Sequence, residues 1–318
     1  MIKNAWKFND IKLAKGLDMK TFKFSRIKTD EQTEFYGYFW YNLPKGKALF
    51  KPFNRLNFPK IRIYNEMICQ QLLTDLNLPH TNYEPAHLKE DIGLVSYNFV
   101  QDNEKLITLA DFMSSAHFLC LPNLVNCQQA IDYHSAQGIY INRSKFIQTL
   151  FAYNVFDMLT LQTDRHSLNL GVIKNSEINT MRLAPLFDNE YAFGAFTFDT
   201  TPEQAEIKQV YENSQKFMTF SIKQTTPNHR IEENIKHIVL YANSNPKLMQ
   251  TLQYILKNID INKAIRNVEK LGYKAPQSYK TYLKQTLSLT KQKFKQYLAA
   301  EKVENQAKQI PTNEELYL

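Results

Sequence analysis

Three polar side chains follow one another along the chain at a spacing that suits phosphoryl transfer from ATP. Asp164 stands five residues before Asn169, and Asp188 follows that asparagine by nineteen residues, at the end of an apolar run. In such chemistry one carboxylate accepts or orients the attacking hydroxyl proton, while a carboxylate and an amide oxygen hold Mg²⁺ against the phosphates. The Asp-x-x-x-x-Asn spacing is common by chance, so its meaning depends on what surrounds it.

Two charged residues nearer the amino terminus supply that context. Lys51 ends a predicted strand over residues 47–52, and Glu66 lies in the first half of a predicted helix whose apolar residues recur at helical spacing over 64–73. Protein kinases place a lysine on such a strand, where it pairs with the nucleotide phosphates and with a helix glutamate. They also have the Asp-x-x-x-x-Asn spacing, followed by a metal-binding aspartate. The order of the elements therefore favours a kinase.

The catalytic segment resembles a known family. Asp164-Arg165-His166 with Asn169 and Gly171, followed by Ala184-Pro185-Leu186-Phe187-Asp188, is similar to the catalytic segment of the HipA-like serine/threonine kinases. The exit of the Glu66 helix, Leu76-Asn77-Leu78-Pro79, is also similar. The resemblance covers about residues 45 to 195, and its specific part is the catalytic segment.

The resemblance implies a role for each residue. Asp164 would be the catalytic base, Asn169 and Asp188 the Mg²⁺ ligands, and Lys51 the phosphate-binding lysine paired to Glu66. ATP and Mg²⁺ would be the cofactors, and a protein of unknown identity the substrate. The family includes toxin kinases, which would imply a small helix-turn-helix antitoxin as partner, and stand-alone secreted kinases. Because the chain lacks the extra amino-terminal domain of full-length HipA toxins, we expect a short or stand-alone member.

The expected fold is α+β and two-lobed, like that of protein kinases. A small β-rich lobe over residues 1–100 would bind the nucleotide, a helical lobe over 101–304 would carry the catalytic loop, and 305–318 would be a flexible tail. Strands are expected at 20–24, 34–41 and 93–100. Helices are expected at 108–115, 144–159 (capped by Asn142 or Ser144), 202–215, 230–243, 246–258, 261–271 and 276–304.

The end of the strand over residues 93–100 is a predicted hinge. Backbone groups of Asn98, Phe99 and Val100 would hydrogen-bond the adenine edge, because a hinge offers N–H and C=O groups beside an apolar pocket.

One loop departs from the kinase pattern. Kinases cover the ATP phosphates with a glycine-rich loop, but the loop over residues 25–33 contains no glycine. Side chains of Arg26 and Lys28 would replace the glycine-rich backbone, or the segment is a solvated hairpin loop. The family resemblance adds autophosphorylation of Ser25, Thr29 or Thr33. Two alternatives to a protein kinase stay open: a kinase of a small molecule or lipid headgroup, and a pseudokinase acting as a binding module.

Composition narrows the class of protein and of partner. The formal net charge of +8 favours acidic partners, yet no zinc-finger spacing, RNP-type motif or long basic block predicts direct nucleic-acid binding. The three cysteines form no Cys-x-x-Cys pair, so neither a zinc site nor a disulfide framework is expected. No run of 18 apolar residues and no apolar leader is present, so we expect no membrane helix and a cytoplasmic location. Secretion into another cell by a specialised system would leave no such mark.

Overall fold

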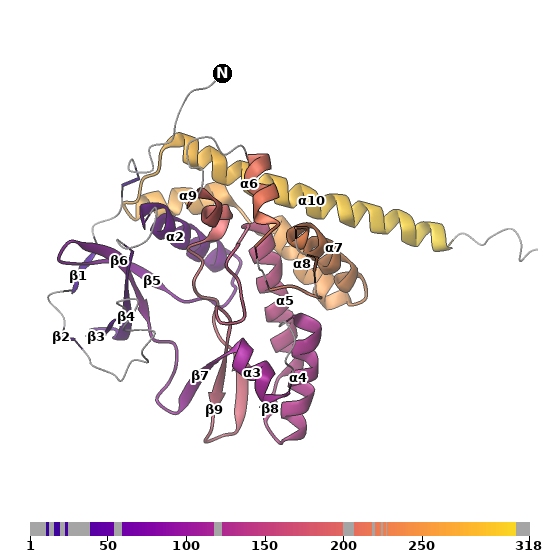
Figure 1. The fold of residues 1–318 in the computed structure, drawn as a ribbon, viewed down its shortest axis with the longest axis horizontal. Helices are drawn as coiled ribbons and strands as arrows, with labels where there is room; N and C mark the ends of the chain where they lie inside the picture. Colours follow the sequence, from indigo (N-terminus) through magenta and orange to yellow (C-terminus); the bar gives the residue numbers. More distant parts are fainter. Residues whose placement is uncertain are drawn as a thin grey trace, which may run out of the picture.

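The computed structural model has a β-rich amino-terminal part and a larger helical carboxyl-terminal part (Figure 1). It describes residues 11–12, 16–19, 23–24, 39–53, 59–117, 123–199, 207–217, 220–223, 225–226 and 228–309. The α+β class predicted from the sequence is thereby confirmed. The glycine-free loop 25–33, with Ser25, Arg26, Lys28, Thr29 and Thr33, lies outside the described residues, as do 310–318 of the predicted tail.

A six-stranded sheet carries Lys51. Its order is β1-β5-β6-β4-β3-β2, with β1 Leu17–Asp18, β2 Lys23–Phe24, β3 Phe39–Leu43, β4 Gly46–Pro52, β5 Tyr83–Leu88 and β6 Asp91–Tyr97. Along β4, Ala48 and Phe50 are buried in the sheet's apolar cluster. Because side chains alternate along a strand, Lys51 points to the opposite face. Strands β4 and β6 approach closely there, and a Cβ on Gly93 would lie 2.2 Å from the Lys51 carbonyl oxygen, so this position requires glycine.

The second sheet contains the hairpin between the predicted catalytic loop and Asp188. Its order is β7-β9-β10-β8, with β7 Glu104–Thr108, β8 Tyr140–Ile141, β9 Gly171–Asn175 and β10 Thr180–Leu183. Strands β9 and β10 pair antiparallel, with Leu183 opposite Val172. This pairing returns the chain to the start of the hairpin, so that the segments before β9 and after β10, which carry Asn169 and Asp188, come near each other.

Helix α2, Pro59–Asp75, confirms and extends the predicted helix at 64–73. Its apolar residues Tyr64, Ile68 and Leu72 are buried. Arg62 and Glu66, one helical turn apart, are buried as well. Buried charges need partners, so this helix face must meet complementary groups.

Helix α5, Arg143–Leu159, leads into the predicted catalytic loop. The Asn142 side chain accepts a hydrogen bond from the Lys145 N–H and caps the helix, as one of the two predicted caps. All residues of α5 from Leu150 to Leu159 are buried. Figure 1 shows α5 in the middle of the helical part, with α10, Gln277–Gln309, running along one edge. Such burial supports the loop that follows α5 rigidly.

The other helices complete the helical part of the molecule (Figure 1). They are α3 Leu109–Ser115, α4 Leu124–Ala136, the 3₁₀ segment η3 Ala192–Asp199, α6 Ile207–Ser214, α7 Arg230–Asn243, α8 Pro246–Asn258, α9 Ile261–Lys270 and α10 Gln277–Gln309. The predicted helices 230–243 and 246–258 have these bounds, and α10 continues five residues into the predicted tail. Helix α4 was not predicted. None of the helices in the described part of the chain is long and apolar enough to cross a membrane.

Candidate active site

The loop after α5 holds Asp164 through its own hydrogen bonds. The Asn169 side-chain amide donates to the Asp164 carbonyl oxygen at 2.9 Å and to its Oδ2 at 3.2 Å. The Gln162 side chain accepts from the Asp164 N–H at 3.2 Å. With Nδ2 turned to Asp164, the Asn169 Oδ1 is left to serve as a ligand oxygen. The five-residue spacing thus brings the two predicted residues into direct contact.

Arg165 ties this loop to its surroundings from within the core. Its side chain is 0% exposed, and its guanidinium donates to both oxygens of Asp157 on α5, at 2.9 and 3.2 Å. The same group donates to the carbonyl oxygens of Asn169 and Phe187 and to Oδ1 of Asn189, the last at 2.6 Å. Burial alone would lower the pKa of Arg165, but Asp157 raises it. The arginine therefore stays charged and holds the Asn169 and Asp188 segments together.

Asp188 sits in a constrained turn. Its φ of 61° lies in the left-handed region, which aspartate tolerates better than most residues. The Asp188 N–H donates to the Tyr83 hydroxyl at 3.1 Å, and Gln162 donates to the Asp188 carbonyl oxygen at 3.2 Å. Contacts from the sheet and from the catalytic loop thus hold the backbone on both sides of this aspartate. Such strain is often retained where a side chain must have one direction.

Lys51 reaches the same point from β4. Its Nζ lies 2.6 Å from Asp188 Oδ1 and 2.6 Å from Glu190 Oε2, and its side chain is 14% exposed. Glu66 accepts hydrogen bonds from the Asn189 N–H at 2.6 Å and from the Asn189 side-chain amide at 2.9 Å. The implied Lys51–Glu66 ion pair is not among the contacts of Glu66 within the described residues. The acidic partners of Lys51 are Asp188 and Glu190 instead.

The carboxylates gathered here influence one another. Burial would raise the pKa of Asp188, but the Lys51 ammonium holds it below its ordinary value. Burial and the neighbouring Asp188 raise the pKa of Asp164. They also raise the pKa of Glu66, to about 8. The Asp164 and Asp188 carboxylates thus repel each other, and a further cation between them would relieve this repulsion.

The donor set fits a magnesium ion that also uses phosphate oxygens. Asn169 offers an amide oxygen and Asp188 a carboxylate, both hard ligands that Mg²⁺ prefers. Within the described ranges, no three His, Cys, Asp or Glu side chains are grouped as an all-protein metal site. Two protein ligands suffice where the ion is held with a nucleotide.

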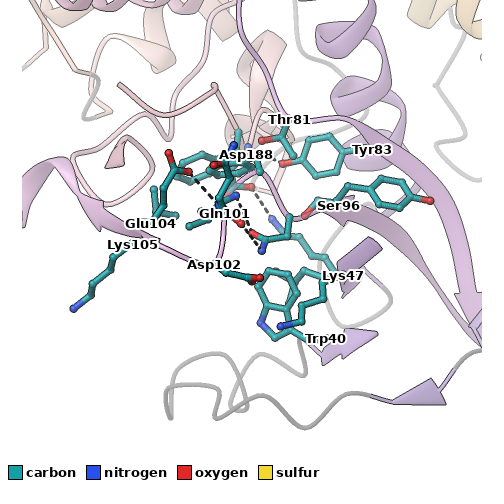
Figure 2. A pocket seen from close by; sticks show the side chains of 18 residues that line it. Trp40, Lys47, Thr81, Tyr83, Ser96, Gln101, Asp102, Glu104, Lys105 and Asp188 are labelled. Atoms are coloured by element: carbon teal, nitrogen blue, oxygen red, sulfur yellow. Dashed lines mark hydrogen bonds and ion pairs between the residues drawn. The ribbon is translucent and has the colours of Figure 1, made fainter. Parts of the chain in front are cut away.

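A cavity of about 590 Å³ opens beside this cluster, and Lys51 and Asp188 line it. The predicted hinge residues Asn98, Phe99 and Val100 line it as well. Figure 2 shows Thr81, Tyr83 and Asp188 together on one side, with Trp40 and Lys47 on another. The size and the mixed apolar and polar lining suit a small-molecule ligand. Asp164 and Asn169 do not line the cavity, and the Asp164 side chain is 33% exposed next to it.

The backbone groups of the predicted hinge have hydrogen-bond partners within the chain. The Val100 N–H donates to the Asn98 Oδ1 at 3.1 Å, and the Val100 carbonyl oxygen accepts from the Asn98 Nδ2 at 2.9 Å. The two backbone groups of Val100 that would bind adenine are therefore occupied by a nearby side chain. The backbone N–H of Asn98 also has a partner, because it donates a hydrogen bond to the Lys47 carbonyl oxygen at 2.8 Å.

Several residues of the site were not singled out from the sequence. Glu190 pairs with Lys51, and Thr81 lines the cavity with a buried hydroxyl. Glu190 had a weak signal, because it stands two residues after Asp188 in Asp-Asn-Glu. Thr81 had none, since a lone threonine after a helix exit has no distinguishing pattern. His166, which belongs to the predicted motif, has its Nε2 3.8 Å from Asp164 Oδ1.

Comparisons with known proteins agree in fold. No family model matches the chain, and no curated protein matches its sequence. The structure of CtkA, a proinflammatory kinase of Helicobacter pylori, matches with a TM-score of 0.66 at 16% identity, over 92% of this chain and 100% of that chain. The structure of HipA from Shewanella oneidensis MR-1, in a toxin–antitoxin complex with HipB and operator DNA, matches with a TM-score of 0.52 at 13% identity, over 80% of this chain and 58% of that chain. In its fold this chain is similar to both structures, with a β-rich amino-terminal part and a larger helical carboxyl-terminal part, and the predicted α+β fold is confirmed.

Proposed function

We propose that the chain is an ATP-dependent serine/threonine kinase of HipA-like type, which transfers the γ-phosphoryl group of Mg-ATP to a protein hydroxyl and phosphorylates itself. One observation carries the proposal. Lys51 and Asp188 contact each other and line a nucleotide-sized cavity, and Asp164, bonded to Asn169, lies close enough to both for their charges to act on its carboxylate, although the four residues are spread over 137 positions of sequence. A chance Asp-x-x-x-x-Asn pattern has no reason to lie beside a part-buried lysine from a distant strand.

The reaction would use these residues in distinct roles. The base would lie in the cavity near Phe99 and Phe187, whose rings stack with centroids 6.3 Å apart, and the phosphates would reach Lys51 and Asp188. Mg²⁺ held by Asn169 and Asp188 would neutralise phosphate charge. The Asn169 side-chain amide donates a hydrogen bond to Oδ2 of Asp164. The other oxygen of Asp164, Oδ1, would therefore accept the proton of the attacking hydroxyl. The raised pKa of Asp164 supports this role in accepting a proton.

The wider role is proposed from the two matched proteins. One is described as a proinflammatory kinase and the other belongs to a toxin–antitoxin complex. We propose a cytoplasmic or secreted effector kinase, or a toxin-system kinase with a small helix-turn-helix partner. The net charge of +8 supports an acidic protein substrate. Co-purification with the product of a neighbouring gene would support the toxin role.

Intact-mass and phosphosite measurement after incubation with Mg-ATP tests the activity. Wild-type protein should gain phosphate on serine or threonine, while Asp164→Ala and Asp188→Ala should gain none. Residues 25–33 are the first segment to inspect. Nucleotide binding without phosphate transfer to any protein would contradict the protein-kinase proposal, and transfer to a small molecule alone would reassign the substrate. Equal phosphate incorporation by wild type and Asp164→Ala would show that Asp164 is not the catalytic base.

A further inference from the structure

The ammonium of Lys51 has a second acidic partner besides the proposed metal ligand. Its Nζ lies 2.6 Å from Glu190 Oε2, and the Glu190 side chain is only 5% exposed. This oxygen has no hydrogen-bond donor elsewhere in the described part of the chain, so Lys51 is the group that balances it. A buried carboxylate in such contact restricts where the ammonium can go.

Helix α2 holds the other end of this carboxylate. Arg62 Nη1 lies 3.3 Å from Glu190 Oε1, and the Arg62 side chain is also 5% exposed. The guanidinium contacts the next residue too, since it donates to the Tyr191 hydroxyl and stacks on that ring with its carbon 3.9 Å from the centroid. Each oxygen of Glu190 therefore faces a different cation, one from β4 and one from α2.

Both carboxylate oxygens of Glu66 accept hydrogen bonds from a residue other than Lys51. They accept from the backbone N–H and the side-chain amide of Asn189. Because Glu66 and Arg62 are one turn apart on α2, the helix holds two consecutive residues, Asn189 and Glu190, immediately after Asp188.

We infer that Glu190 is a positioning residue for Lys51, and that Glu66 instead positions the segment that carries Asp188. This inference rests on the proposed function. If Asp188 is needed at the metal and the phosphates, its carboxylate cannot be the sole anchor of Lys51. Glu190 supplies a second anchor that does not line the nucleotide cavity. The usual lysine–glutamate pair of kinases is thereby divided between two glutamates.

Double-mutant cycles test this division, with Lys51→Met combined with Glu190→Gln and with Glu66→Gln. The first readout is the KM for ATP and kcat. Glu190→Gln should raise the KM for ATP about 10-fold in the wild-type background, as expected for the loss of a charged contact. In the Lys51→Met background it should change the KM less than about 2-fold, since there is no ammonium left to position. Glu66→Gln should have the same effect in both backgrounds.

The second readout is the thermal midpoint without nucleotide, which does not require activity. Glu190→Gln should lower the midpoint less in Lys51→Met than in wild type, and the Glu66→Gln shift should be equal in both. Glu269→Gln is the matched control, because Glu269 forms a part-buried lysine pair with Lys280 at 2.8 Å between α9 and α10. Its shift should not depend on Lys51. If Glu190→Gln does not fold, Glu190→Asp enters the same cycle, since it keeps the charge but is one methylene shorter.

The outcomes separate this inference from the proposed function. Independent effects of Lys51→Met and Glu190→Gln on the midpoint would overturn the inference, as would coupling of Lys51 to Glu66 instead. Absence of turnover and of ATP binding in wild type would contradict the proposed function, while the midpoint cycle would still decide which glutamate couples to Lys51.

Discussion

The two ends of the cavity are built in different ways. At the Asp188 end, Arg165, Glu66 and Glu190 are buried and bind groups far away in sequence. At the hinge end, Asn98 is exposed and bonds to Val100, two residues away. Buried, multiply bonded groups keep their geometry before a ligand arrives, whereas exposed local bonds exchange readily with water or a ligand. The Asp188 end is therefore preorganised, and the Asn98 end is adaptable.

The largest expected effect separates chemistry at the preorganised end from binding in the cavity. Asp164→Ala should lower kcat by about 10²- to 10⁴-fold, the usual contribution of a general base. ATP binding should be largely kept, because Asp164 does not line the cavity. Steady-state kinetics with calorimetric titration of nucleotide measures both. His166→Ala is the control, since its ring is 3.8 Å from Asp164 and partly exposed, and it should retain most of the turnover. A loss of binding equal to the loss of turnover would show that the two ends are not separable.

The second effect concerns how strongly the buried network holds this end. Arg165→Met leaves Asp157 buried without its partner, which should lower the free energy of unfolding by about 3–5 kcal/mol. Arg143→Met is the matched control, because Arg143 pairs with Asp132 at 3.0 Å and both side chains are more than half exposed. An exposed pair of this kind should contribute about 0–1 kcal/mol. Urea unfolding of both variants measures the difference, and equal losses would mean that the Arg165 network gives no special rigidity.

A smaller effect is expected at Thr81, which lies on the Asp188 side of the cavity. Its hydroxyl is buried, lines the cavity and has no hydrogen-bond partner among the described residues. Thr81→Val should therefore leave the free protein as stable as wild type or slightly more stable, because no bond is lost. If a bound nucleotide satisfies the hydroxyl, the same change should weaken ATP binding about 5- to 10-fold. Thr81→Ser should bind like wild type. Unchanged ATP affinity in Thr81→Val would show that no ligand reaches this hydroxyl.

The sequence was informative where local spacing determines contact. Asp164 and Asn169 meet because a short loop joins them, and the apolar faces of α7 and α8 define those helices without reference to the rest of the chain. Helix α4 was missed, since its sequence Leu-Val-Asn-Cys-Gln-Gln mixes polar and apolar residues without a clear start. Its first turn depends on the Asn123 side chain, which accepts from the Asn126 N–H.

The pairing of charges could not be predicted in the same way. Lys51 is 139 residues from Glu190 and 15 from Glu66, and spacing along the chain does not decide which carboxylate it meets. That choice depends on where α2 places Arg62 and Glu66 against Asn189 and Glu190, which is a matter of tertiary packing. Likewise, the hinge position was predictable from the strand ending, but the Asn98 bonds to Val100 were not.

The smallest expected effect tests the adaptable end directly. Asn98→Ala removes two exposed hydrogen bonds to Val100, and two consequences oppose each other. First, the Val100 N–H and C=O become available to a base. Second, the turn loses the side chain that orders it, and ordering each freed residue again on binding costs about 1–2 kcal/mol of conformational entropy. Because water can bond to the exposed Val100 groups with or without the Asn98 side chain, the loss of order in the turn should have the larger effect on binding. We therefore expect the KM for ATP to rise about 2- to 10-fold with kcat unchanged.

Asn103→Ala is the control, since Asn103 bonds to Glu177 and does not line the cavity. A lower KM in Asn98→Ala would reverse the conclusion: the Asn98 side chain would then compete with the base for Val100, and the hinge would be blocked rather than adaptable.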